Sequence, residues 1–155
     1  MKKKSAKQLA DPADEDFLLE HSPFFRLTQA EGMYQQRMAE NLKAVGMDIP
    51  RWRILMILHE KSPSTISEIA ERALMKLSTM TRVAQRMERD GLVRLAPNEN
   101  DARSTDVHLT DAGVQAIATI RGVASRTYRR ATEDFSTAEL SQLISLLERL
   151  REALH

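Results

Sequence analysis

Hydroxyl and arginine side chains are concentrated in one short stretch of the chain, and both groups can bind nucleic acid. Ser78 and Thr79 lead the stretch, and Arg82, Arg86 and Arg89 follow at helical spacing. Hydroxyl and backbone N–H groups can bind phosphate, whereas an arginine can hydrogen-bond the edge of a guanine in the major groove. This order of side chains is typical of a helix that enters the major groove of duplex DNA by its N-terminal end.

A further arginine, Arg103, lies in a run of turn-forming residues from 96 to 104. The segments on either side, residues 92–95 and 105–109, have the composition of β-strands. The pattern predicts a β-hairpin with Arg103 at its tip, where the long side chain is attracted by the negative potential of a minor groove. Asp101, two residues earlier, can hold a neighbouring guanidinium by a charge-assisted hydrogen bond.

Two helices must position these groups. The first begins at Thr65, because Thr65 and Glu68 have the spacing of a capping box. Its apolar face is expected to contain Ile66, Ile69, Ala70 and Leu74. The second helix runs from about Leu77 to Asp90, and its inner stripe is expected to contain Met80, Val83, Ala84 and Met87. Helix, turn, helix and hairpin in this order predict a winged helix-turn-helix.

Further helices and a polar arm flank this unit. The first fifteen residues are polar and charge-segregated, which indicates a disordered or loosely attached arm. Helices are predicted from about Pro23 to Val45, from Arg51 to Glu60, from Thr110 to about Phe135, and after Ser136. The expected fold class is mainly α with a small β-wing (α+β). The expected organisation is a flexible polar arm (1–20), an N-terminal helix (21–48), a winged lobe (49–110) and C-terminal helices (111–155).

Charge is distributed unevenly although the net charge of the 155 residues is only +1. Residues 72–103 contain seven basic and four acidic side chains, whereas residues 133–155 contain five acidic and two basic ones. The positive charge therefore coincides with the proposed DNA-binding face. Cysteine is absent, no apolar stretch is long enough to cross a membrane, and the basic start is not followed by the apolar run of a secretion signal. These features favour a cytoplasmic protein without membrane contact.

Catalytic and metal-binding patterns are not found. The four histidines, at positions 21, 59, 108 and 155, are isolated from carboxylates at metal-ligand spacing. The sequence contains no nucleophile elbow, no glycine-rich phosphate loop and no His-Glu-x-x-His motif. We therefore expect a protein that is not an enzyme and has no metal or other cofactor.

An ordered set of motifs resembles the MarR family of bacterial winged-helix repressors. The matching segments are Ser78-Thr79-Met80-Thr81-Arg82, Glu88-Arg89-Asp90-Gly91-Leu92-Val93, Asp101-Ala102-Arg103 and Leu109-Thr110-Asp111-Ala112-Gly113. The resemblance covers about residues 20 to 154. Two positions depart from the family pattern: Lys76 stands where a small N-capping residue is common, and Ala102 replaces one arginine of the wing. The residues expected to contact DNA are Lys76, Ser78, Thr79, Thr81, Arg82, Arg86, Asp101 and Arg103.

The resemblance also implies a homodimer, formed by the first helix and the last two. The last helix carries an apolar stripe at helical spacing, formed by Leu140, Leu143, Ile144, Leu147, Leu150 and Leu154. Such a stripe needs a partner surface, although packing within its own domain is the alternative. A two-fold dimer would place two recognition helices in successive major grooves of a pseudo-palindromic double-stranded operator.

Members of the family often bind small aromatic or phenolic compounds between the dimerisation helices and the winged lobe. Candidate effector-binding residues are His21, Phe24, Phe25, Arg26, Met33, Tyr34, Arg51, Trp52 and Met56. Aromatic and methionine side chains can line an apolar pocket for an aromatic anion. An aromatic acyl-CoA thioester is one such anion. The alternatives are that these residues belong to the core, and that the chain is a constitutive DNA-binding or protein-interaction dimer without an effector. Repression and activation both remain open.

Overall fold

The computed structural model describes residues 4–154, so Met1, Lys2, Lys3 and His155 lie outside the described residues, including the outermost parts of the expected arm and C-terminal region. The chain divides into two compact units, residues 1–49 and 50–155. We describe each unit by itself.

The first unit is helical. It contains α1 (Ala6–Leu9), a short 3-10 helix, η1 (Leu19–His21), and the long helix α2 (Pro23–Lys43). Ser22 caps α2, because its hydroxyl accepts a hydrogen bond from the N–H of Phe25, and Pro23 occupies the first turn. The predicted start of this helix is confirmed. Its end comes two residues before Val45, and Gly46 adopts a positive φ of 70° just beyond it.

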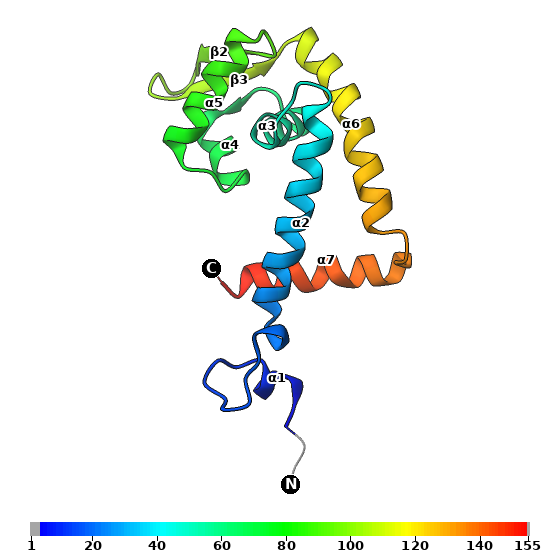
Figure 1. Cartoon of the computed structure of the whole chain (residues 1–155). Helices are drawn as coiled ribbons and strands as arrows, with labels where there is room; N and C mark the ends of the chain where they lie inside the picture. The colour runs from blue at the N-terminus through cyan, green and yellow to red at the C-terminus, as the bar shows by residue number, and fades with distance from the viewer. Residues whose placement is uncertain (1–3, 155) are drawn as a thin grey trace. The chain divides into compact units, whose positions relative to one another are not determined.

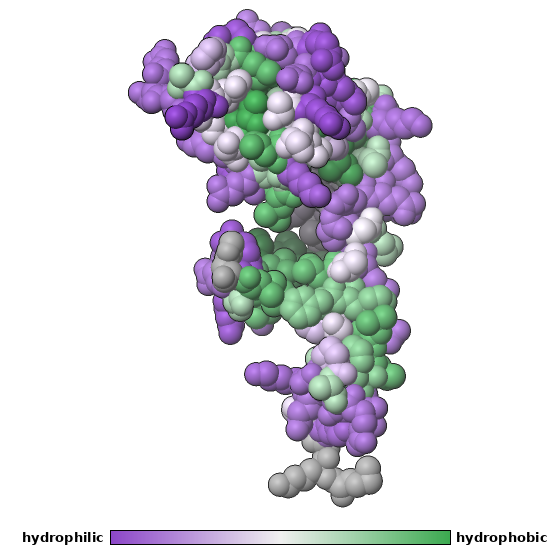
Figure 2. All heavy atoms as spheres, turned by 90° about the vertical axis from the view of Figure 1, so that its left-hand side faces the viewer, coloured by the Kyte–Doolittle hydropathy of each residue, from purple (hydrophilic) through white to green (hydrophobic). Residues whose placement is uncertain are grey.

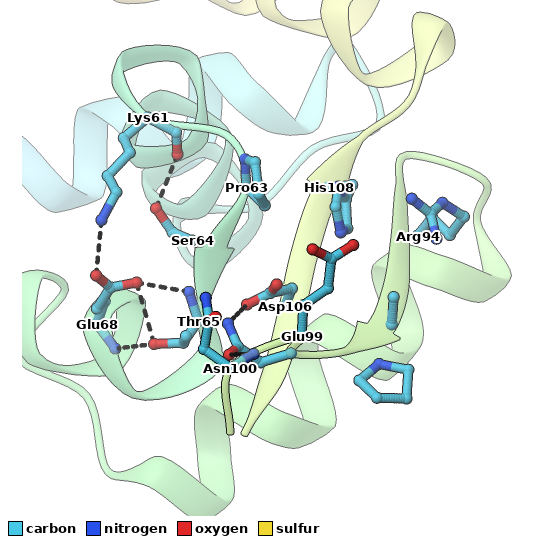
Figure 3. Close-up of a pocket in the computed structure, with 13 residues that line it drawn as sticks. Lys61, Pro63, Ser64, Thr65, Glu68, Arg94, Glu99, Asn100, Asp106 and His108 are labelled. Atoms are coloured by element: carbon cyan, nitrogen blue, oxygen red, sulfur yellow. Dashed lines mark hydrogen bonds and ion pairs between the residues drawn. The ribbon is translucent and has the colours of Figure 1, made fainter. Parts of the chain in front are cut away.

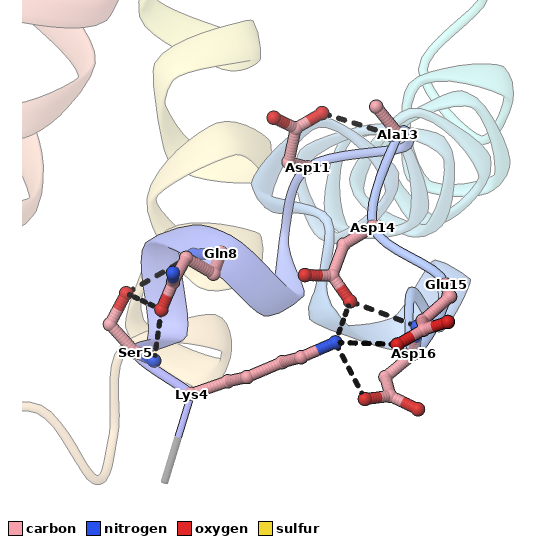
Figure 4. A network of polar contacts seen from close by, with 8 residues as sticks. All are labelled: Lys4, Ser5, Gln8, Asp11, Ala13, Asp14, Glu15 and Asp16. Atoms are coloured by element: carbon pink, nitrogen blue, oxygen red, sulfur yellow. Dashed lines mark hydrogen bonds and ion pairs between the residues drawn. The ribbon is translucent and has the colours of Figure 1, made fainter. Parts of the chain in front are cut away.

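Residues 4–16 form a local polar network (Figure 4). Lys4 Nζ lies 2.7 Å from carboxylate oxygens of both Asp14 and Asp16. These contacts raise the pKa of Lys4 and lower that of Asp14, because hydrogen bonding between opposite charges favours both charged forms. Ser5 and Gln8 form a capping box on α1. The segment therefore has local structure that its composition did not predict, while the flexibility of the arm stays a prediction.

The second unit contains the winged helix-turn-helix (Figure 1). Its elements are α3 (Ile49–Glu60), β1 (Ser64–Thr65), α4 (Ile66–Arg72), α5 (Leu77–Arg89), β2 (Val93–Pro97) and β3 (Thr105–Leu109). The strands form an antiparallel sheet in the order β1-β3-β2, with Leu95 of β2 opposite Val107 of β3. The expected mainly helical fold with a small β-wing is confirmed. Both helices of the helix-turn-helix lie where the sequence predicts them.

The core of this lobe is made of side chains that the helical and strand periods direct inward. Its fully buried members include Ile54, Leu55, Leu58, Ile69, Met80, Met87 and Val107. Thr65 and Glu68 form the predicted capping box, so α4 begins at the expected residue.

Leu74 differs from its expected position. We expected it on the apolar face of the first helix, but its side chain is 94% exposed. The helix α4 ends at Arg72, and the N–H of Met75 donates to the carbonyl of Ala70, as in a Schellman motif. This motif requires a left-handed residue, and Leu74 supplies it with a φ of 51°. The reversal of the chain turns the Leu74 side chain away from the face that helical spacing had predicted.

Two longer helices, α6 (Asp111–Ala131) and α7 (Thr137–Glu152), follow the wing. Thr110 caps α6, but the helix ends four residues before the expected Phe135, because Thr132 leaves helical geometry with a φ of −114°. Its buried side chains are Ile117, Ile120 and Val123. Tyr128, further along the helix, is 56% exposed, so the large buried side chains end at Val123.

The helix α7 begins after Ser136, as predicted. A capping box of Ser136 and Glu139 forms its start, and none of its residues is buried. Leu143, Ile144, Leu146 and Leu147 of α7 are between 38% and 62% exposed, whereas Leu140 and Leu150 are half-buried. In the winged lobe from residue 50 to 110, the exposed large hydrophobic side chains are those of Leu74 and Leu77. Figure 2 shows hydrophobic residues, in green, on the surface outside the winged lobe. Among residues 4–154, no helix has both the length and the apolar character needed to cross a bilayer.

Candidate nucleic-acid interface

The helix α5 presents two different faces. Met80, Ala84 and Met87 are fully buried beneath it. The opposite face exposes the predicted contact residues Ser78, Thr79, Arg82 and Arg86. Since the helix is held by its buried face, the exposed side chains form a rigidly supported row.

The N-terminal end of α5 has no side-chain cap. Lys76 occupies the N-cap position, and only its backbone carbonyl contributes, by accepting from the N–H groups of Thr79 and Met80. Lys76, which departs from the family pattern, therefore leaves α5 without the side-chain cap that a small N-capping residue would provide. An exposed lysine at this position places positive charge at the helix end, where phosphate binding is also favoured by the helix dipole.

Thr81 is placed differently from its neighbours. It is half-buried, and its hydroxyl donates a 2.9 Å hydrogen bond to the carbonyl of Leu77. A hydroxyl that already donates to the backbone has no proton for a phosphate oxygen. We therefore leave Thr81 out of the contact set proposed below.

Long-range polar contacts tie the C-terminal half of α5 to its surroundings. Glu88 Oε1 accepts a 2.8 Å hydrogen bond from the backbone N–H of Leu95 in β2. Asp90, the C-cap residue, pairs at 3.1 Å with Arg51 of α3, whose side chain is only 15% exposed. The Glu88 side chain thus connects α5 to the wing, in addition to the peptide chain between them.

At the tip of the wing, Asp101 acts on the backbone. Its carboxylate accepts hydrogen bonds from the N–H of Arg103 at 3.0 Å and from the hydroxyl of Ser104 at 2.9 Å. We expected this carboxylate to hold a guanidinium, and that interpretation is wrong within the described residues, where no ion pair of Asp101 occurs. Asp101 lies in the same turn as Arg103, so its short side chain reaches the backbone N–H of Arg103 and does not bind the long arginine side chain.

Arg82 on α5 and Arg103 in the wing loop are both exposed. Neither has an ion-pair partner within the part of the chain that the structure describes. Their charges are therefore available to phosphate or base acceptors. The sequence analysis missed two residues that support the wing: Glu88, which accepts from Leu95, and Asn98, whose side chain donates to Asp106 at 2.8 Å. The only signal for Asn98 was the high turn propensity of its segment.

The predicted effector residues are divided between the two units. In the first unit, Phe24, Met33 and Tyr34 are exposed, and Phe25 is half-buried. His21 and Arg26 are exposed as well, and Arg26 Nε donates to the carbonyl of Glu20 at 3.0 Å.

In the second unit, Trp52 and Met56 are half-buried, and the guanidinium of Arg51 is engaged by Asp90. An anionic effector at Arg51 would have to compete with that carboxylate. The pocket found on the wing sheet is lined by none of these nine residues.

The fold and the exposed basic face define the class of winged helix-turn-helix proteins. A family model described as the MarR family matches residues 47–105. The HTH-type transcriptional repressor IacR of Pseudomonas putida is 41% identical over 138 residues, which are 89% of this chain and 83% of that protein. The chain belongs to the MarR family, and it is a transcriptional regulator and not an enzyme.

Two further comparisons extend this result. The homoprotocatechuate degradative operon repressor of Escherichia coli is 33% identical over 98 residues, 63% of this chain and 66% of that protein. A crystal structure of a mutant MarR from E. coli in complex with operator DNA has a TM-score of 0.75 at 22% identity, covering 84% of this chain and 95% of that one. The second comparison shows that the fold is shared.

Proposed function

We propose that this protein is a dimeric, sequence-specific DNA-binding repressor that a small aromatic anion releases from its operator. The observation that carries DNA binding is the pair of unpaired cations, Arg82 on α5 and Arg103 in the wing, on elements joined by the Glu88–Leu95 hydrogen bond. An arginine on a recognition helix suits a guanine edge, and an arginine at a wing tip suits a narrow minor groove.

The remaining contacts are assigned by chemistry and position. Ser78, Thr79 and Lys76 lie at the N-terminal end of α5 and would bind phosphate oxygens, as Arg86 would further along the exposed face. Asp101 would act indirectly, by holding the backbone of Arg103. These contacts fix the position of the protein on the duplex, and Arg82 supplies base discrimination.

The support for a homodimer is the exposed apolar stripe of α7. Leu143, Ile144 and Leu147 are 44%, 62% and 38% exposed in the single chain, and contiguous apolar surface of this kind marks interaction sites. A second copy is the partner that a pseudo-palindromic operator requires. Association through α7 would leave α5 free to bind DNA in each subunit.

Repression is supported by the names of the relatives, and release by an effector is our proposal. Two of them are named as repressors, and the name of one refers to homoprotocatechuate degradation. The exposed Phe24, Met33 and Tyr34 of α2 would contact the aromatic ring, and His21 or Arg26 the anion. Release requires that the effector bind the DNA-free conformation more tightly, because equal affinity for both states shifts nothing.

The test begins with selection of binding sites from a random duplex library. We expect an inverted repeat whose half-sites lie about one helical turn apart. Calorimetry with hydroxylated aromatic acids and their CoA thioesters, followed by DNA titration with the best ligand, tests release. Failure to enrich any sequence would reject the DNA-binding proposal, whereas enrichment with no ligand effect would favour a constitutive DNA-binding dimer.

A further inference from the structure

The outer face of the wing sheet carries a pocket of about 480 Å³ (Figure 3). Its floor contains Arg94 and Ala96 of β2 and Asp106 and His108 of β3, since Val93 and Val107 face the core. Many of the polar groups around it bind one another. Asn98 and Asp106, which join the wing loop to the sheet, are among them.

The side chain of Asn98 makes three hydrogen bonds. Its Nδ2 donates to Asp106 Oδ1 at 2.8 Å. Its Oδ1 accepts from the backbone N–H groups of Asn100 and Asp101, both at 2.9 Å. Because a carboxylate accepts and backbone N–H groups donate, only this orientation of the amide satisfies all three partners. One half-buried side chain therefore connects β3 to the start of the loop.

The contacts continue from Asn98 to the wing tip. The N–H of Asn98 donates to the carbonyl of Ser104 at 3.0 Å, which closes the loop at its base. Asp101, whose N–H is held by Asn98, in turn holds the N–H of Arg103. The side chains of residues 99–103 are exposed, so the backbone that carries Arg103 is held by these bonds and by the two that Ser104 donates to Asp101.

We propose that Asn98 is a positioning residue for DNA binding, which holds the wing loop through Asp106 and thereby presents Arg103 to the minor groove. The inference rests on the proposed contact of Arg103 with DNA. A loop that is ordered before binding loses less conformational freedom in the complex, so its arginine binds more tightly. Loosening the loop should weaken DNA binding without removing any group that touches DNA.

Swapping the residue types at positions 98 and 106 tests the hydrogen bond between Asn98 and Asp106. In N98D the carboxylate at position 98 still accepts from both backbone N–H groups, but it faces the carboxylate of Asp106. In the double variant N98D/D106N the new amide at position 106 can donate to the new carboxylate at position 98, and the net charge equals that of the wild type. We expect N98D to lose about five- to tenfold in operator affinity, the order of one hydrogen bond, and the double variant to recover most of it.

Matched controls separate this effect from charge and from Arg103. N100D adds the same charge to the loop at a side chain that has no hydrogen bond in the described residues. We expect its affinity to fall less than that of N98D, and amide hydrogen exchange at residue 98, whose N–H donates to the carbonyl of Ser104, to accelerate only in N98D. In an R103A background, N98D and N100D should have equal effects, because the positioned group is absent.

The outcomes are distinguishable. If R103A alone binds the operator as well as wild type, the proposed wing contact is wrong. If R103A weakens binding but N98D matches N100D, or the double variant does not recover, the positioning role of Asn98 is overturned. Thermal unfolding of each variant identifies losses of affinity that come from global destabilisation.

Discussion

The carboxylate of Glu88, near the end of the recognition helix, accepts a 2.8 Å hydrogen bond from the backbone N–H of Leu95 in the wing strand β2. In the sheet order β1-β3-β2, strand β2 lies at an edge. An edge strand has N–H groups without a strand partner. The Glu88 carboxylate accepts from one of them, the N–H of Leu95. The contact links the two elements that we propose to bind DNA.

Replacing Glu88 by Ala should reduce both stability and operator affinity. The N–H of Leu95 would lose a charged acceptor, at a cost of about 1–2 kcal/mol in unfolding free energy, since the site is exposed to water. E88Q keeps an acceptor and should lose less. The control is E71A, because Glu71 is an exposed glutamate of α4 with no side-chain partner in the described range. Urea unfolding and DNA titration give the two quantities, and equal values for E88A and E71A would contradict the prediction.

Replacing Arg82 by Ala should cost about 1–3 kcal/mol in operator binding and relax sequence preference at one base pair of each half-site. Arg82 would contribute a base contact, so affinity for scrambled duplex should change less. R89A is the matched control, since Arg89 is an exposed arginine in the last turn of the same helix. The interpretation of Arg82 fails if the two variants lose the same affinity on operator and scrambled DNA.

Gly113, in the first turn of α6, should not tolerate a side chain. A Cβ at this position would lie 2.2 Å from the carbonyl oxygen of Leu92, so backbone must move. We expect G113A to lose about 1–3 kcal/mol in unfolding free energy, as overpacked sites do. In G122A of the same helix, the nearest atom to the new Cβ would be the Arg126 guanidinium at 4.0 Å, and stability should rise by about 0.5–1 kcal/mol. Similar denaturation midpoints for the two variants would exclude this explanation.

Replacing Leu147 by Asp should dissociate the proposed dimer. The substitution would place an unpaired carboxylate in the apolar stripe of α7, at a cost of several kcal/mol, roughly the range for burying a charge without a partner. S145D introduces the same side chain on the opposite side of the helix and should leave the dimer intact. Sedimentation at micromolar concentration distinguishes the species. A monomeric wild type would reject the dimer directly.

Glu68 should make stability depend on pH below 5. Hydrogen bonds from Lys61 and from Thr65 lower the pKa of Glu68 from 4.5 to about 2. A lowered folded-state pKa means that this stabilisation is present above pH 4.5 and is lost as the pH falls towards 2. The Glu68 side chain is 46% exposed, so screening by water and salt limits the effect to under about 1 kcal/mol.

The comparison of wild type with E68Q measures this contribution. The difference in unfolding free energy should be largest near pH 7 and should decrease between pH 4.5 and 2, in low salt. A difference that is independent of pH over this range would show that the charge of Glu68 does not contribute.

The sequence alone determined the features that depend on neighbouring residues. The capping box of Thr65 with Glu68 and the start of α7 after Ser136 lie where the sequence predicted them. The buried face of α5 also follows from its helical period. These features need only residues within a few positions of one another, because the helix itself brings them together.

The tertiary structure decided the features that join distant segments. The Glu88–Leu95 bond, the Asn98–Asp106 bond and the approach of Gly113 to Leu92 each require the wing to fold back on its neighbours. Leu74 shows the limit of periodicity, since a turn that reverses the chain after Arg72 makes an apolar residue exposed. Periodicity predicts which side of a helix is buried, but it does not predict the turn after Arg72, where Arg53 of the preceding helix α3 donates to the carbonyl of Ala73 at 3.3 Å.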